Sequence, residues 1–99
     1  MGGGEGEAKA KANAEIVEIG RITHFFSRIS VAVVELRDSI SVGDKIWIKG
    51  ATTDFKQTVE SMQIQHKNVE TAGPGESIGL KVIDRVRNGD IVYRLPKDG

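Results

Sequence analysis

The sequence predicts an all-β fold, a small closed barrel of six strands in Greek-key order. Apolar and polar residues alternate in several short runs, and this period of two is that of a β-strand. Turn-forming glycine, asparagine, aspartate and proline residues separate these runs at intervals of roughly 8–12 residues. No long stretch has a helical period. Closure is expected because it removes sheet edges that so short a chain could not otherwise protect.

The first two runs predict two strands. "EIVEIGRITHFF" is rich in β-branched and aromatic residues, and Gly20 within it indicates a bulge or a close backbone approach. "RISVAVVEL" is apolar in both phases, with Ile29, Val31 and Val33 in one phase. We expect this strand to be buried on one side and partly covered on the other.

The run "ISVGDKIWIKG" predicts a turn at residues 42–44 and then a strand. Ile46 and Ile48 should face inward, so Trp47 should face outward between two lysines. "FKQTVESMQIQ" predicts one long strand, with a bulge near Ser61 because its apolar phase changes there.

The last two runs are "SIGLKV" and "RNGDIVYRL". The first alternates strictly, with its isoleucine, leucine and valine inward. Gly79 lies in the outward phase, which indicates a close approach of backbone or ligand and makes it the hardest residue to replace in this region. The second begins with an Asn88-Gly89 turn signal before a final strand.

Gly73, Pro74 and Gly75 form a tight group before a strand. A phosphate-binding loop would open a helix and carry a lysine followed by serine or threonine, and neither is found here. Pro74 also lacks an amide donor. We therefore predict a corner rather than a nucleotide site, in which Pro74 presets φ and both glycines adopt conformations that other residues avoid.

Length and composition limit the organisation. Ninety-nine residues correspond to one domain. Residues 1–14 contain no large apolar side chain after Met1, so we expect a disordered head, followed by a single barrel domain over residues 15–97. No apolar run is long enough to cross a membrane and no targeting signal is recognisable, so the cytoplasm is the default expectation.

Residues that carry catalytic or metal chemistry are sparse. The chain has no cysteine, and its two histidines, His24 and His66, are far apart in the sequence. Carboxylates beside glycines, such as Asp44, Glu76 and Asp90, are expected to form turns. We therefore predict no catalytic residue, no cofactor, no metal site and no enzymatic activity.

The charge distribution is mildly basic. From Gly20 to Lys97, twelve lysine and arginine residues stand against nine acidic ones, a net charge of about +3. Dedicated nucleic-acid-binding domains are usually more basic, so weak RNA contact is expected. Trp47 between Lys45 and Lys49 could stack on a base or anchor a protein partner.

The segments "SISVGDKIWIKG", "QTVESMQIQHKNVETAGPGESIGLKV" and "RNGDIVYRL" resemble, in this order, the second domain of translational GTPases such as elongation factor Tu. "VVELRDSISVGDKIWIKG" also resembles the C-terminal barrel of collagenase-like peptidases. The resemblance to the GTPases implies a six-stranded barrel of the domain-two type. It places Gln63, Gln65 and His66 on the strand that contacts the aminoacyl end of transfer RNA. The chain departs from that family at Gln63 and at Val33-Val34, and it has no GTPase domain.

These observations predict a non-catalytic, translation-factor-like barrel that binds RNA or the ribosome. The alternative is a protein–protein adaptor that works in trans with a larger peptidase-like or translation-factor partner. No nucleotide and no membrane are expected as partners. The residues predicted to contact RNA or a partner are Arg28, Lys45, Trp47, Lys49, Gln63, Gln65, His66, Lys67, Ser77, Ile78, Gly79, Leu80 and Lys81.

Overall fold

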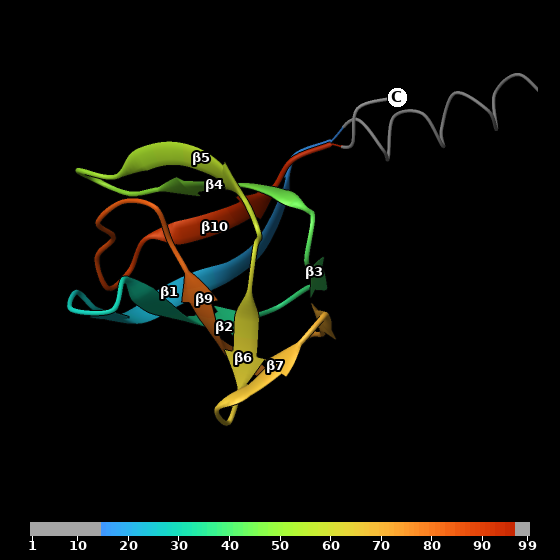
Figure 1. The fold of residues 1–99 in the computed structure, drawn as a ribbon. Coiled ribbons are helices and arrows are strands. Elements are labelled where there is room, and N and C mark those ends of the chain that lie inside the picture. Colours follow the sequence, from blue (N-terminus) through green and yellow to red (C-terminus); the bar gives the residue numbers. More distant parts are fainter. Residues whose placement is uncertain (1–14, 97–99) are drawn as a thin grey trace, which may run out of the picture.

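The computed structural model describes residues 15–96 and is all-β, as predicted (Figure 1). The predicted disordered head, residues 1–14, lies outside the described residues, as does Lys97. In the described range, no helix is long and apolar enough to cross a membrane. The strands of this range are β1 (Val17–Phe26), β2 (Val31–Leu36), β3 (Ile40–Ser41), β4 (Lys45–Lys49), β5 (Asp54–Thr58), β6 (Met62–Ile64), β7 (Lys67–Val69), β8 (Thr71–Ala72), β9 (Ser77–Lys81) and β10 (Ile91–Arg94).

The prediction of a closed six-stranded barrel is wrong in its detail. Eight strands form one sheet in the order β5-β4-β10-β1-β2-β9-β6-β7, while β3 and β8 form a separate pair. The sheet curls into a half-barrel, and its backbone ladder ends at β5 on one side and β7 on the other (Figure 1). The additional strands arise because one predicted long run splits into β5 and β6, and because the short strands β3, β7 and β8 were not predicted.

The run from Phe55 to Gln65 is not one bulged strand. β5 ends at Thr58 and β6 begins at Met62, and the two strands lie near opposite ends of the sheet order. The segment between them crosses the opening of the half-barrel, where Val59 donates its N–H to the carbonyl of Asp44 at 2.8 Å. This crossing, rather than a bulge, explains why the apolar phase changes.

The core lies inside the curl and follows the predicted alternation. On β4, Ile46 and Ile48 are fully buried while both lysines are exposed. On β9 and just beyond it, Ile78, Leu80 and Val82 are buried. The buried apolar residues of the described range form one cluster: Ile19, Ile22, Ala32, Val34, Leu36, Ile40, Ile46, Ile48, Val59, Met62, Ala72, Ile78, Leu80, Val82, Val86 and Val92.

The predicted irregularity at Gly20 is confirmed. The register of β1 against β10 shifts between Glu18 and Gly20, as in a β-bulge. A Cβ on Gly20 would lie 2.8 Å from the backbone oxygen of Glu35. The register of β1 against β2 shifts between Ile22 and His24. Beyond this shift, the inward and outward positions of β1 exchange phase.

Three four-residue turns have the same sequence pattern, in which the third residue is glycine and the fourth carries a carboxylate. They begin at Ser41, Gly73 and Arg87, and the third-position glycines have φ of +98°, +88° and +97°. In each turn the fourth residue donates its N–H to the first carbonyl, at 3.0, 3.2 and 3.0 Å. These features are those of a type II turn.

The carboxylates of these turns, on Asp44, Glu76 and Asp90, have the predicted role. Each accepts the N–H of the first residue of its turn, at 2.9, 2.7 and 2.8 Å. The Gly73-Pro74-Gly75 group is therefore a corner, as predicted. Only its second glycine has a positive φ, so the expectation of an unusual conformation at Gly73 is wrong.

Candidate binding surfaces

The outer face of β4, β5 and β10 carries two aromatic side chains. Trp47 and Tyr93 are cross-strand partners, with ring centroids 5.4 Å apart and planes inclined by 36°. Both are half-buried. They point away from the core on adjacent strands, and this pair of tilted rings is called here the aromatic shelf.

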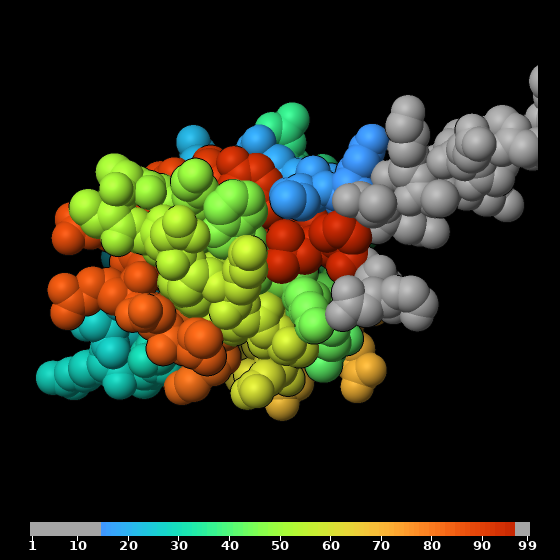
Figure 2. Space-filling view, turned by 90° about the horizontal axis from the view of Figure 1, so that it is seen from above, coloured from blue at the N-terminus to red at the C-terminus, as the bar shows by residue number. Residues whose placement is uncertain are grey.

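Charged groups surround and fix the aromatic shelf. The indole N–H of Trp47 donates to the carboxylate of Asp54 at 2.7 Å, which holds the ring in one orientation. The ammonium groups of Lys49 and Lys56 lie 5.2 and 5.6 Å from the centroid of the indole, within the range of a cation–π interaction. The shelf is therefore aromatic and positively charged at once. Figure 2 is a view from above onto the part of the molecule that contains β4 and β5.

A second surface gathers apolar side chains at the end of the half-barrel formed by the β1–β2 turn. Phe26, Ile29 and Ile83 are 47%, 56% and 68% exposed. Their segments are adjacent, because Val82 donates its N–H to the carbonyl of Ser30 at 2.9 Å. The β1–β2 turn and the segment after β9 lie side by side in both views (Figures 1 and 2). These three residues are called here the apolar end.

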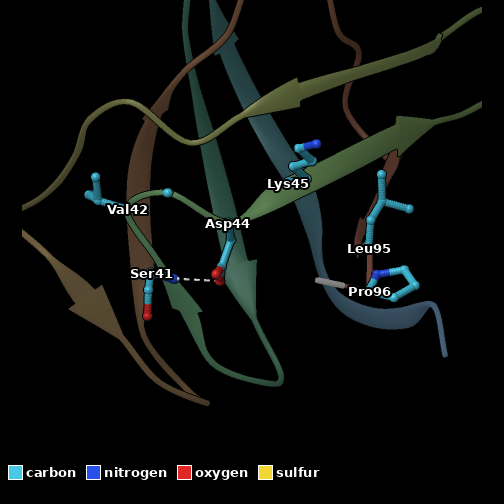
Figure 3. A pocket seen from close by; sticks show the side chains of 7 residues that line it. Ser41, Val42, Asp44, Lys45, Leu95 and Pro96 are labelled. Carbon is cyan, nitrogen blue, oxygen red and sulfur yellow. Dashed lines mark hydrogen bonds between the residues drawn. The ribbon is translucent and has the colours of Figure 1, made fainter. Parts of the chain in front are cut away.

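A hollow of about 500 Å³ opens beside the β3–β4 turn (Figure 3). It is lined by Ser41, Val42, Gly43, Asp44, Lys45, Leu95 and Pro96. The carboxylate of Asp44 is buried and accepts the N–H of Ser41, so it serves the turn. The hollow thus combines the apolar Val42, Leu95 and Pro96 with the polar Ser41 and Lys45, and its one carboxylate is already engaged in the turn.

The glycine predicted to be irreplaceable, Gly79, lies between Val33 and Gln63 on the neighbouring strands. A Cβ built on it would lie 3.3 Å from a methyl group of Val31, a contact that a small side-chain movement relieves. Gly20 and Gly50 have closer neighbours. The expectation that Gly79 is the hardest residue to replace in its region stays a prediction, and its contacts favour only a moderate penalty.

The predicted site residues are dispersed rather than gathered into one basic patch. Lys45 and Lys49 belong to β4, the second strand of the sheet order, whereas Lys67 belongs to β7, the last. The ammonium group of Lys81 donates to the carbonyl of Ile29 at 2.8 Å, so it fastens the β1–β2 turn. Arg28, Ser77 and Gln63 are exposed on separate elements, while Ile78 and Leu80 are buried in the core, where a ligand cannot reach them.

Gln65 and His66 were predicted to lie on a strand, but they do not. They form the two-residue turn between β6 and β7, with φ of +51° and +68°. Two positive values between paired strands are typical of a type I′ turn. Their conformation therefore reflects the hairpin.

The sequence analysis missed Tyr93, Lys56 and Asp54, which complete the surroundings of Trp47. Their outward phase could be read from the alternation in "DFKQT" and "IVYR", but their pairing with β4 could not. It also missed the apolar end, because its three residues come from two distant segments. Within residues 15–96, no group of three or more histidine and acidic side chains could hold a metal ion.

Comparison with known proteins connects the chain with peptidases. It is 48% identical over 80 residues, 80% of its own length, to an uncharacterized protease of Methanocaldococcus jannaschii. It is 34% identical over 88 residues, 87% of its length, to a collagenase of Porphyromonas gingivalis. The chain spans about a fifth of the length of these relatives. No protein-family model matches it.

The fold matches a solved structure of the same kind. The C-terminal domain of a Geobacillus thermoleovorans protein, named as a U32 peptidase, superimposes with a TM-score of 0.74. The match covers 79% of this chain and 91% of that domain, at 17% sequence identity. The chain is similar to collagenase-like peptidases, and its fold is that of a peptidase C-terminal domain.

These comparisons correct three predictions. The resemblance to collagenase-like peptidases is confirmed, whereas none of these relatives is a translational GTPase. The predicted translation-factor-like module for RNA or the ribosome is therefore wrong. The prediction that the chain is not an enzyme is contradicted too, because relatives named protease and collagenase connect it with protein-cleaving enzymes.

Proposed function

We propose that this chain is a half-barrel domain of a U32-type peptidase and serves that enzyme as a binding domain. The observation that carries the proposal is the 48% identity to a protease over 80 residues. The aligned length is close to that of the whole described domain, so the match extends beyond a short motif. The TM-score of 0.74 to a peptidase C-terminal domain supports the same assignment.

A binding role fits the chemistry of the described residues. Peptide hydrolysis requires an activated nucleophile or a metal-bound water. Here the carboxylates of Asp44, Glu76 and Asp90 are occupied by turn N–H groups. We therefore assign polypeptide contact to the surfaces of this half-barrel, and peptide cleavage to the four fifths of the relative's length beyond the matched segment.

The apolar end is the surface we assign to contact with that larger part. Phe26, Ile29 and Ile83 expose about half or more of their surface. Burying a large apolar side chain is favourable by roughly 1.5–3 kcal/mol, so these three can contribute to holding the two parts together. Exposed apolar groups gathered in this way commonly mark an interaction site.

A chimera tests this function. The matched segment of the Methanocaldococcus jannaschii protease is replaced by residues 15–96 of this chain, and gelatin hydrolysis is measured. We expect the chimera to cleave gelatin, the protease without the segment to be at least tenfold slower, and the Phe26→Asp, Ile29→Asp chimera to lose activity. Ile16→Asp is the matched control, since Ile16 is 51% exposed but lies outside the apolar end. Full activity of the protease without the segment would contradict the proposed function.

A further inference from the structure

We infer that Asn88 is a site of spontaneous deamidation, and that the turn before β10 controls how fast the reaction occurs. The inference does not depend on the proposed function. Asn88 and Gly89 are the two central residues of the turn that begins at Arg87, and both are exposed. Among residues 15–96, the side-chain amide of Asn88 has no hydrogen-bond partner. This amide is therefore accessible to solvent and to the neighbouring backbone.

The reaction requires only water and the backbone of the turn. The nitrogen of Gly89 loses its proton to hydroxide and attacks Cγ of Asn88, and the side-chain nitrogen leaves as ammonia. The product is a five-membered succinimide ring, closed by the new bond between that nitrogen and Cγ. Water then opens the ring at either carbonyl. One opening leaves an aspartyl residue, and the other leaves an isoaspartyl residue whose backbone runs through Cβ and Cγ and is one carbon longer.

The residue after an asparagine decides how easily the ring forms. Gly89 has no Cβ, so its nitrogen can approach the side-chain carbonyl without a steric clash. Asn68, the other asparagine of the described range, is followed by the β-branched Val69, which crowds the approach. Asn68 also lies in β7, where its side-chain oxygen accepts the amide of Gln63 at 3.1 Å. Asn68 is therefore an internal control for the reaction at Asn88.

The folded turn restrains the attacking nitrogen. The N–H of Gly89 donates to the carbonyl of Ile22 at 2.7 Å, so the proton that must be lost is held in a hydrogen bond. The turn is closed by two more bonds, from the N–H of Asp90 to the carbonyl of Arg87 at 3.0 Å and from the N–H of Arg87 to the carboxylate of Asp90 at 2.8 Å. An amide held in this way reacts with hydroxide when its hydrogen bond opens, as in hydrogen exchange. Deamidation should therefore follow the opening of the turn.

The isoaspartyl product alters the start of β10. This strand begins at Ile91, directly after the turn, and lies between β4 and β1 in the sheet (Figure 1). An added backbone carbon within the turn moves Asp90 relative to Arg87, so the two bonds that close the turn cannot both keep their geometry. The modified chain is therefore less stable than the original one. The extent of modification increases with the time that the turn has spent open.

The test follows the full 99-residue chain at about pH 8.5 and about 37 °C, with samples digested by trypsin and measured by mass spectrometry. Cleavage after Lys67, Lys81, Arg87 and Arg94 places the two asparagines in separate peptides, residues 68–81 and 88–94. Replacement of NH2 by OH raises the mass of the modified peptide. We expect peptide 88–94 to gain this mass at least about tenfold faster than peptide 68–81. Equal rates, or no gain in peptide 88–94, would overturn the inference.

Control by the turn is tested in two ways. Guanidinium chloride at a concentration that unfolds the chain should speed deamidation of Asn88 at least about tenfold, because every molecule is then open. In the folded chain, Asp90→Ala removes one closing bond and should speed the reaction, whereas Glu76→Ala, the same change in the turn that begins at Gly73, should not. Circular dichroism confirms that both variants are folded. If Asp90→Ala does not fold, the measurement in denaturant still decides, since equal rates in folded and unfolded chains overturn the control by the turn.

Asn88→Gln tests the consequence for the fold. Glutamine would have to form a larger, six-membered ring and deamidates much more slowly, while it retains an exposed amide. After long incubation, we expect the original chain to have a lower Tm than a fresh sample and Asn88→Gln to keep its Tm. An unchanged Tm in a fully modified chain would overturn the effect on β10. None of these measurements involves the chimera, so the proposed function succeeds or fails independently of them.

Discussion

The carboxylate of Asp90 occupies the space in which a side chain on Gly50 would stand. A Cβ built on Gly50 would overlap that carboxylate and lie 2.6 Å from its Cγ. Asp90 is 4% exposed and accepts the N–H of Arg87, so it cannot move aside without losing a buried hydrogen bond. The end of β4 and the turn before β10 therefore pack closely at Gly50, which leaves no room for a side chain.

Gly50→Ala should lower the free energy of unfolding by about 1–3 kcal/mol, because an added methyl group forces a shift in a packed region. For a domain of this size, each 1 kcal/mol lowers the Tm by roughly 4–8 °C. Gly73→Ala is the control, since nothing lies within 4 Å of the position of its Cβ and its φ is not positive. Thermal unfolding of both variants measures the difference. Equal stabilities would show that Asp90 does not constrain Gly50.

Removing the carboxylate should lower the free energy of unfolding by different amounts in the glycine–carboxylate turns. Asp90→Ala leaves the N–H of Arg87 without its partner at a partly buried position, and a hydrogen bond to a charged group contributes about 1.5–3 kcal/mol. Glu76→Ala removes the equivalent bond to Gly73 at an exposed position, where water replaces it, and should cost less than about 1 kcal/mol. Urea unfolding checks the order, and a larger loss at Glu76 would refute the role of burial.

Gln57 joins the free edge of β5 to the chain that leaves β9. Its side-chain amide donates to the carbonyl of Lys81 at 2.9 Å and accepts the N–H of Ile83 at 2.9 Å. One side chain thereby replaces a backbone ladder where the half-barrel would otherwise be open. Gln57→Leu should lower the free energy of unfolding by about 1–2 kcal/mol and expose the N–H of Ile83 to solvent exchange.

Amide hydrogen exchange followed by NMR measures this effect at Ile83 directly. Gln57→Glu is the matched variant, because it retains the acceptor for that N–H and loses only the donor to Lys81. We therefore expect Ile83 to exchange faster in Gln57→Leu than in Gln57→Glu. Equal exchange in the two variants would mean that the segment after β9 is held by other contacts.

The alternation of residues predicted the strands that face one common core. Ile46, Ile48 and Leu80 are fully buried as expected, because a period of two assigns each residue of a strand to one face. The alternation could not predict which strands pair. The break between Thr58 and Met62 and the bridge formed by Gln57 depend on segments distant in sequence, so the alternation could predict neither the half-barrel nor the side chain that spans its opening.

The candidate surfaces were predicted less well than the core for the same reason. Trp47 was recognised as outward-facing, and Lys49 beside it as its neighbour, since both belong to one strand. Tyr93 could join them only once β10 was known to pair with β4. Ile78 and Leu80 were included in the predicted site, although their inward phase already assigned them to the core.

The β6–β7 turn offers a stabilising substitution. Gln65 and His66 have φ of +51° and +68°, a region that costs an ordinary L-residue of order 1 kcal/mol. Asn-Gly is the preferred pair in a type I′ turn, because asparagine tolerates positive φ and glycine has no Cβ to clash.

The double variant Gln65→Asn, His66→Gly should therefore raise the free energy of unfolding by about 0.5–1 kcal/mol, and the Tm by several degrees. Neither wild-type side chain is buried, so no packing is lost. Replacing the same residues in the reverse order, Gln65→Gly and His66→Asn, matches the composition but uses a less favoured order, and should give a smaller gain. A decrease in Tm for Asn-Gly would show that the hairpin is not a type I′ turn in solution, or that His66 makes a contact that the hairpin needs.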